Sequence, residues 1–358
     1  MTVNLDNVVA LRAMDPQDML GWVERFPEQV ADAWERADQV ILPDSHMGKD
    51  HIVIVGMGGS AIGGDLLAAL MAPTANVPVT VVRQYRLPAW VNENSLVIAS
   101  SYSGNTEETL SAFQDALTRG AAVMALTTGG KLERMALDKG LPVVVFPGGG
   151  QPRAALGYSL ILLLGIMRAG GYYTLPAEAR AEAEHVLDEL NSAYAPDVPE
   201  EENEAKQMAR SLFGRIPYVM GAGHLSPVAR RWKTQFNENS KQWAAFDEMS
   251  ELNHNTIMGT AAPKDLPDHV ALVSLEAENE RPRIKARWDI TADIFKQAGL
   301  LHLRLTAPGD FAFTQVLGTV HLGDFVSVYL AFLNGKDPSD IGNINYLKAE
   351  LAKLPDTI

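Results

Sequence analysis

Cysteine is absent from the 358-residue chain. Its absence excludes disulfide bonds, thiolate metal sites and a cysteine nucleophile. Basic residues are also in deficit, because 30 Lys and Arg stand against 44 Asp and Glu, for a formal net charge of −14. Proteins that follow a nucleic-acid backbone need a basic surface. We therefore expect no nucleic-acid partner, and any small anionic substrate must be held by local dipoles and a few cations.

Membrane signals are missing as well. We find no apolar run close to the ~20 residues that a helix needs to cross a bilayer. The first residues, Met1-Thr-Val-Asn-Leu-Asp6, lack the basic and then apolar pattern of a secretory signal. We therefore expect a cytoplasmic protein with no membrane contact. The length, together with 47% hydrophobic residues, favours two domains with substantial cores.

Short apolar strands alternate with helical stretches in two parts of the chain. The first part predicts strands at 50–56, 79–83, 96–100, 122–127 and 143–146, with helices at 61–71, 106–118 and 131–139. The second predicts strands at 216–221, 270–275 and 300–305, a helix opened by Ser226 as cap and Pro227, and a long apolar helix at 313–333. This alternation predicts an α/β fold with parallel sheets and right-handed crossovers.

The pattern also suggests domain limits. We expect an N-terminal helical segment at 1–45, a first α/β domain at 46–173, a helical linker at 174–213, a second α/β domain at 214–335 and a C-terminal tail or helix at 336–358.

A glycine-rich loop follows the first predicted strand, in Gly56-Met-Gly-Gly-Ser-Ala-Ile-Gly-Gly64. Glycines here let a ligand approach the backbone at a helix N-terminus. Gly56, Gly58 and Ala61 roughly fit a dinucleotide fingerprint, but the carboxylate expected for the ribose is absent near 81–84. Arg83 suits a 2′-phosphate, so an NADP site stays open, as does a tight turn that binds nothing.

A hydroxyl-rich loop follows the third predicted strand, in Ser101-Tyr-Ser-Gly-Asn-Thr-Glu-Glu-Thr109. Hydroxyls and successive backbone amides at a helix start form an anion cradle. Because no lysine follows, as it does in nucleotide triphosphate loops, a monophosphate fits better. The alternative is an ordinary serine-capped helix.

These two loops resemble the sugar-isomerase (SIS) domain, which binds phosphosugars. Three further segments narrow the resemblance: Gln151–Tyr158, Phe236–Lys241 and Glu251–Asn255. Together the five segments resemble the bifunctional phosphoglucose/phosphomannose isomerases, a branch of the phosphoglucose isomerase superfamily, over residues 45 to 350. The resemblance implies two SIS-type domains, each a Rossmann-like, flavodoxin-type parallel sheet with helices on both faces.

The resemblance also implies roles for residues that bind the substrate. The first loop would contact the sugar, and the second would hold its phosphate; the residues are Gly58, Gly59 and Ser60, then Ser101, Ser103 and Thr106.

Four further residues would act on the sugar. Arg153 would lie against the reacting C1–C2 edge, and Glu238 would be the base. His254 would open the ring as acid and base, supplied by the partner subunit of a homodimer. Lys348 matches the family's terminal lysine.

The chemistry of isomerisation suits these groups. One carboxylate can move a proton between C2 and C1 through a cis-enediolate. A guanidinium stabilises the developing oxyanion without losing its own proton, and imidazole titrates near neutral pH. The reaction needs neither metal nor redox cofactor, so we expect none.

Each of these side chains also fits an ordinary structural role. Without the resemblance, Glu238, His254, Arg153 and Lys348 would be surface or loop residues. Glu251 and His254 have the spacing of two metal ligands, but no further ligand cluster accompanies them. Trp232 and Phe236, four apart, are better explained by core packing.

The leading hypothesis is an aldose–ketose isomerase of glucose 6-phosphate, fructose 6-phosphate and, we expect, mannose 6-phosphate. One rival is a phosphosugar-binding regulator without chemistry, although the acidic first 45 residues offer no basic face for DNA. Others are an NADP-dependent reductase and an isomerase of another phosphosugar. The glucosamine-forming kind relies on a glutaminase domain with an N-terminal cysteine, which is absent here.

Overall fold

The computed structural model describes residues 3–354 and divides them into two compact units. Unit 2 is Arg25–Glu184, and unit 1 takes the described residues before Arg25 and from His185 onward. The boundary between the units falls inside helix α8 (Ala177–Tyr194). The sequence analysis instead expected one N-terminal segment at 1–45 and a helical linker at 174–213. Residues 1–2 and 355–358 of the two expected terminal segments lie outside the described residues.

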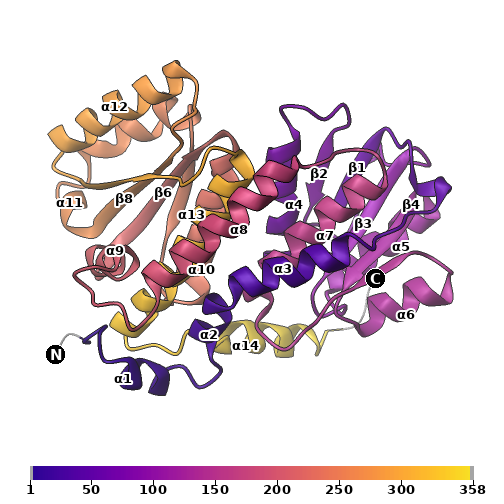
Figure 1. Ribbon diagram of the computed structural model, residues 1–358, viewed down its shortest axis with the longest axis horizontal. Helices are drawn as coiled ribbons and strands as arrows, with labels where there is room; N and C mark the ends of the chain where they lie inside the picture. The colour runs from indigo at the N-terminus through magenta and orange to yellow at the C-terminus, as the bar shows by residue number, and fades with distance from the viewer. Residues whose placement is uncertain (1–2, 355–358) are drawn as a thin grey trace. The chain divides into compact units, whose positions relative to one another are not determined.

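Within its described residues, unit 2 contains a five-stranded parallel sheet in the order β2-β1-β3-β4-β5 (Figure 1). The strands match the predicted positions within two residues: β1 (His51–Val55), β2 (Val79–Val82), β3 (Ser95–Ser101), β4 (Ala122–Thr127) and β5 (Val143–Val145). The middle of β3, Leu96–Ala99, is wholly apolar because the strand is buried along its whole length. The flavodoxin-type order is confirmed.

Helices cover both faces of this sheet. Val53, Val97 and Val123 share a core cluster with Phe113 and Leu132, which come from the helices on one face. Helix α7 packs against α4 and α3 on the other. The helices are α3 (Phe26–Ala37), α4 (Gly58–Met71), α5 (Glu107–Thr118), α6 (Gly130–Asp138) and α7 (Leu156–Ala169), with short turns η1 (Asp44–His46) and η2 (Pro152–Ala154).

Unit 1 contains a four-stranded parallel sheet in the order β7-β6-β8-β9 among its described residues. Its strands are β6 (Ile216–Ala222), β7 (Ala245–Met249), β8 (Val270–Glu276) and β9 (Leu301–Thr306). The sequence did not predict β7, because Asp247 and Glu248 interrupt the apolar run of this edge strand, of which only Met249 is buried.

The helices of unit 1 pack around that sheet. Helix α10 (Ser226–Glu238) lies between β6 and α13 (Ala312–Leu333), and Trp288 and Phe295 of α12 (Pro282–Gln297) complete the core on the other face. The remaining elements are α1 (Val8–Ala13), α2 (Met19–Glu24), α9 (Glu204–Leu212), α11 (Leu266–His269), α14 (Gly342–Leu351), η3 (Gly223–Leu225), η4 (Glu251–His254) and η5 (Thr256–Ala261).

Helix α13 corrects one expectation from the sequence. With 22 residues and a mean hydropathy of 1.6 over its most apolar window, it is long and apolar enough to cross a membrane. The statement that no run approaches that length was therefore wrong. The whole of that window is buried inside unit 1, as in the core helix of a globular domain.

The start of α10 corrects a second expectation. Leu225 occupies the N-cap position and makes no side-chain capping bond. Ser226 is already helical, and its hydroxyl donates to the Gly221 carbonyl at 3.3 Å. The reason is that η3 leads directly from β6 into the helix, so the Ser226 side chain turns back towards the strand.

Helix α10 is fixed against α13 by buried polar bonds. Arg231 Nη2 donates to both carboxylate oxygens of Asp324, at 2.9 and 2.7 Å, and Gln235 Nε2 donates to Oδ1 at 2.7 Å. Trp232 Nε1 donates to the Thr319 carbonyl at 2.9 Å. Trp232 and Phe236 are buried with their rings 5.9 Å apart, which confirms their predicted core role.

Candidate active site

The hydroxyl-rich loop lies at the carboxyl edge of the unit 2 sheet, the edge where ligands bind in open α/β folds. Ser101 is the last residue of β3 and is buried, and Thr106 precedes α5. Ser60, in the first turn of α4, accepts a hydrogen bond from the Tyr102 amide at 3.2 Å. The structure therefore brings the two predicted loops together.

The hydroxyls of this loop do not act as helix caps. Thr106 occupies the N-cap position of α5 but makes no capping bond, and its Oγ1 lies 3.0 Å from Ser101 Oγ. The exposed Ser103 accepts from the Asn105 amide at 3.2 Å. The first-turn amides of α5 thus lack the side-chain acceptor that a capped helix would have. This arrangement favours an anion site over the serine-capped helix.

The loop between β4 and α6 packs against the hydroxyl-rich loop, and sequence reasoning did not identify it. Gly104 has φ +63°, and a Cβ there would lie 1.8 Å from the Gly129 carbonyl oxygen. Gly130 has φ +83°, with the Ser103 oxygen 2.4 Å from its would-be Cβ. Leu132 N donates to the Gly104 carbonyl at 2.9 Å. The Thr-Thr-Gly-Gly sequence between β4 and α6 was the available signal.

The glycine-rich loop approaches the turn that carries Arg153. A Cβ on Gly59 would lie 2.7 Å from the Pro152 carbonyl oxygen, in η2. Arg153 follows in that turn and is 4% exposed, and its Nη1 lies 3.5 Å from Gln151 Oε1. Gly58 at φ +50° adopts the backbone that glycine permits. Unit 2 therefore carries both loops and the turn of Arg153 at one edge of its sheet.

The structure disfavours the alternative of an NADP site, because the cation expected to bind its 2′-phosphate, Arg83, is already paired. Arg83 forms a short ion pair with Asp65 of α4, so the guanidinium already has a carboxylate partner. A 2′-phosphate would have to compete with that pair.

The carboxyl edge of the unit 1 sheet is acidic instead. Strand β8 ends at Glu276, and Glu278 and Glu280 follow. Burial raises the pKa of Glu280 to about 7. Glu276 pairs with Arg304 and Glu278 pairs with Lys285, whereas the unit 2 edge offers hydroxyls and helix-start amides to an anion.

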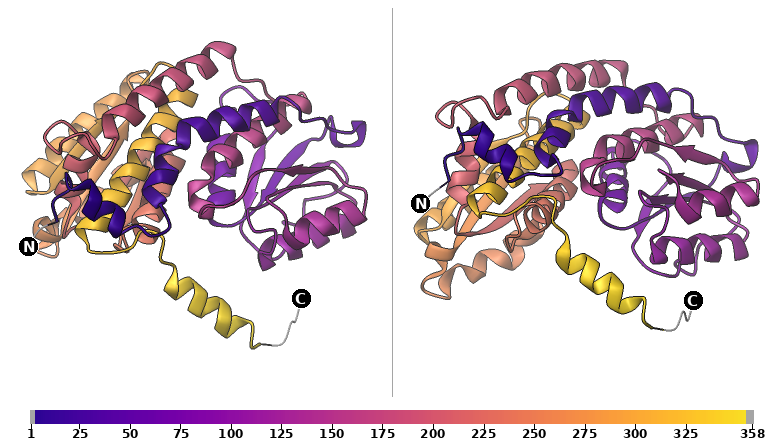
Figure 2. Two further views of the ribbon diagram at one scale, coloured as in Figure 1. Left: turned by 60° about the horizontal axis from the view of Figure 1, so that its bottom comes forward. Right: turned by 90° about the horizontal axis from the view of Figure 1, so that it is seen from below.

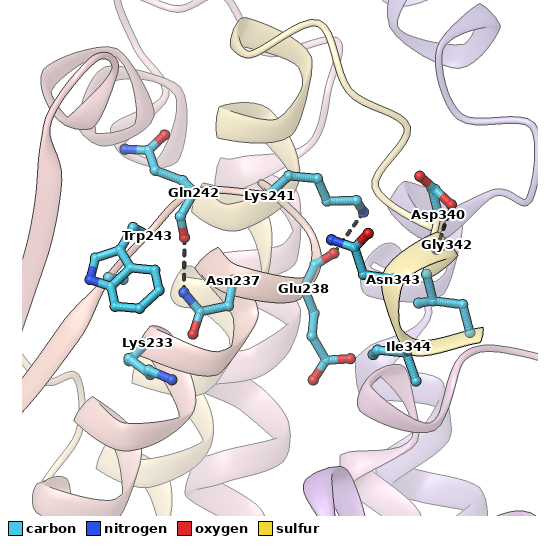
Figure 3. Close-up of a pocket in the computed structure, with 12 residues that line it drawn as sticks. Lys233, Asn237, Glu238, Lys241, Gln242, Trp243, Asp340, Gly342, Asn343 and Ile344 are labelled. Atoms are coloured by element: carbon cyan, nitrogen blue, oxygen red, sulfur yellow. Dashed lines mark hydrogen bonds between the residues drawn. The ribbon is translucent and has the colours of Figure 1, made fainter. Parts of the chain in front are cut away.

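Glu238 is the last residue of α10 and lines a pocket of about 480 Å³ in unit 1 (Figure 3). Lys241 and Trp243 line it from the turn after α10, and Asn343 and Ile344 line it from the start of α14. Sequence reasoning did not identify Lys241, Trp243 or Asn343 as site residues. Lys241 was within the Phe236–Lys241 segment, which was the one available signal.

His254 lies on η4 in unit 1 and is exposed to solvent. Its neighbour Asn253 is held by α12, because Asn253 Nδ2 donates to Thr291 Oγ1 and Arg287 Nη1 donates to Asn253 Oδ1, both at 2.9 Å. Glu251 accepts from Asn255 Nδ2 at 2.8 Å. Among residues 3–354, no group of three His, Asp or Glu side chains is placed to hold a metal ion.

Lys348 lies on α14, whose residues are all exposed. The helix extends away from the body of unit 1 (Figure 2). The pocket around Glu238 reaches Ile344 in the first turn of α14, and Lys348 follows about one turn later.

Comparison with known proteins assigns the chain to a protein family. The SIS domain family matches residues 47–141, and the family described as "Bacterial phospho-glucose isomerase C-terminal SIS domain" matches residues 201–351. A bifunctional phosphoglucose/phosphomannose isomerase from Caldicellulosiruptor bescii is 42% identical over 93% of this chain and 99% of its own length. The chain belongs to this family.

Two further comparisons agree. A bifunctional phosphoglucose/phosphomannose isomerase from Aquifex aeolicus is 36% identical over 84% of this chain and 90% of its own. The crystal structure of a hypothetical protein from Thermus thermophilus has a TM-score of 0.75 at 19% identity, covering 96% of this chain and 92% of that one. The latter likeness shows the fold, and the predicted pair of SIS domains is confirmed.

The close approach of Gly104 to Gly129 gives a testable prediction. Gly104→Ala should destabilise the protein more than Gly120→Ala, because Gly120 has a similar φ of +71° but nothing within 4 Å of its would-be Cβ. The control isolates the left-handed backbone penalty, ~1–2 kcal/mol, and the clash should add at least about 2 kcal/mol. Urea unfolding measures both; equal losses would show that the two loops do not touch.

Proposed function

We propose that the chain interconverts glucose 6-phosphate and mannose 6-phosphate with fructose 6-phosphate. The observation that carries the proposal is the hydroxyl-rich carboxyl edge of unit 2, where Ser101 and Thr106 bond to each other rather than cap α5. Phosphate oxygens can accept from these hydroxyls and from the amides at the helix start. We assign phosphate binding to Ser101, Ser103 and Thr106.

We assign contacts with the sugar to the glycine-rich loop and its neighbour. Gly58 and Gly59 leave the backbone open to a ligand, and Ser60 presents a hydroxyl. The guanidinium of Arg153 stabilises the negative charge that develops on the oxygens at C1 and C2.

We assign proton transfer to Glu238. Its carboxylate takes the proton from C2 of the open-chain aldose, the electron pair of that C–H bond forms the C1–C2 double bond, and the carbonyl oxygen at C1 becomes a hydroxyl by gaining the proton that the C2 hydroxyl gives up. The carboxylic acid then returns a proton to C1 as the C2 oxygen becomes the ketone carbonyl, which gives the ketose. No electron leaves the substrate. The open pocket around Glu238 leaves its carboxyl group accessible to a sugar.

We assign ring opening to His254, acting in the site of a partner subunit of a homodimer. Its exposure on a turn that α12 holds in place suits a group donated to another chain. Lys348 is assigned as an additional cation from α14. We place the enzyme in the cytoplasm, and we take 46–173 and 214–335 as its two SIS-type domains.

The base gives the sharpest test. Wild-type protein should isomerise glucose and mannose 6-phosphates in a coupled assay, unaffected by a chelator, and Glu238→Gln should lower kcat at least ~100-fold because a general base is lost. Affinity for fructose 6-phosphate, measured by calorimetry, should change less than about threefold because the uncharged amide keeps the shape of the carboxylate. The exposed Glu202→Gln is the matched control.

Two results would contradict this assignment. A Glu238→Gln enzyme with near-wild-type turnover would remove Glu238 from the mechanism. A wild type that binds hexose 6-phosphates tightly but turns none over, including glucosamine 6-phosphate, would indicate a phosphosugar-binding regulator.

Donation of His254 across subunits predicts complementation. Glu238→Gln and His254→Ala homodimers should each be inactive, but mixing them should restore activity, because a mixed dimer has one site with both wild-type groups. An equal mixture should regain about a quarter of wild-type activity, since about half of randomly formed dimers are mixed and each has one intact site of two. Mixed dimers that stay inactive, or an active monomer in sedimentation, would refute the donation.

A further inference from the structure

We infer that Lys241 is a positioning residue for isomerisation, whose ammonium ties the end of the helix that carries Glu238 to the segment that leads into α14. The inference rests on the proposed role of Glu238. The observation behind it is that the Lys241 ammonium donates to three backbone carbonyls, and the proposed mechanism uses none of these bonds.

The ammonium of Lys241 lies among oxygens from two segments. Nζ donates to the carbonyls of Glu238 at 2.7 Å and Asn239 at 3.3 Å, at the end of α10. It also donates to the Pro338 carbonyl at 3.1 Å, 97 residues further along the chain. An ammonium has three protons to donate, and here they meet three acceptors.

The helix end explains why a cation suits this place. The last carbonyls of a helix lack intrahelical partners and carry the negative end of its dipole. Lys241 meets this need from outside the helix, because its own backbone is left-handed with φ +53°. Glycine would adopt that backbone at lower cost. A lysine here is therefore explained by its ammonium and not by its backbone.

Further bonds join the turn after α10 to α13 and its C-cap residue Asn334. Asn334 Nδ2 donates to the Ser240 carbonyl at 3.0 Å and to Gln242 Oε1 at 2.7 Å. Asn239 Nδ2 and Ser240 Oγ donate to Ser327 of α13, to its hydroxyl at 2.9 Å and its carbonyl at 2.6 Å. The turn after Glu238 is thus anchored to the core, and Lys241 extends the anchor to Pro338.

The segment beyond Pro338 forms the other wall of the pocket. Asp340 to Ile344 line it opposite Glu238 (Figure 3). Loss of the ammonium would leave the carbonyls of Glu238, Asn239 and Pro338 without this donor. The Glu238 side and the α14 side of the pocket would then lose their direct tie, and small misplacements of reacting groups are costly in rate.

The experiment compares four variants of the full-length protein. Lys241→Met removes the ammonium, Lys241→Gly removes it while easing the backbone, and Lys241→Arg keeps a cation. Lys336→Met is the matched control, because it removes one exposed lysine from the same segment. Steady-state kinetics and hydrogen exchange of the amides in 336–344 are measured for each.

The inference predicts that Lys241→Met and Lys241→Gly lower kcat about 10- to 100-fold while KM changes less than about threefold, because phosphate binding is untouched. Lys241→Arg should recover part of kcat, and Lys336→Met should match wild type. Exchange in 336–344 should quicken in the first two variants only.

A Lys241→Met or Lys241→Gly enzyme with wild-type kcat would overturn the inference, as would a loss of kcat explained by a smaller folded fraction. If the wild type shows no isomerase activity, the proposed function fails; hydrogen exchange then still decides whether Lys241 holds the segment, since unchanged exchange in Lys241→Met would refute the tie.

Discussion

The position of Glu238 depends on the buried ion pair between Arg231 of α10 and Asp324 of α13. Asp324 also accepts from Gln235, so one carboxylate fixes both the rotation and the height of α10 on the core helix. Removing one member of such a pair costs about 3–5 kcal/mol, because the other charge stays buried and unpaired. Glu238 is seven residues beyond Arg231, two turns along a helix thus held. A base on such an element keeps its place while a substrate enters and leaves.

The two sheets share a fold but offer different chemistry at their carboxyl edges. In unit 2 the edge carries neutral hydroxyls and helix-start amides, which suit a phosphate despite the net charge of −14. In unit 1 the same edge carries Glu276, Glu278 and Glu280 and, on the turn after β7, the proposed catalytic His254. The proposed base Glu238 lies elsewhere, at the end of α10. The two edges therefore differ in the groups that they offer to an anion.

Much of the fold follows from local sequence. Eight of the described strands carry short runs of contiguous apolar or β-branched residues, so they could be predicted, as could the approach of the hydroxyl-rich loop to the glycine-rich loop. The edge strand β7 could not, because Asp247 and Glu248 interrupt its apolar run. The partner of Gly104 and the tie from Lys241 to Pro338 join residues distant in sequence. Only the folded backbone reveals them. The role of the glycines in the loop after β4 could not be predicted either, because they leave space for a loop that is distant in sequence.

The central claim is that a carboxylate carries a proton between two carbons of the sugar. The most direct measurement follows deuterium during extended equilibration of fructose 6-phosphate with the enzyme in D₂O. A proton held on a carboxylate exchanges with solvent in competition with its return, so the account predicts deuterium at C2 of the aldose product, detected by NMR. Product that remains free of deuterium after many turnovers would indicate direct hydride transfer between C1 and C2 and would contradict the account.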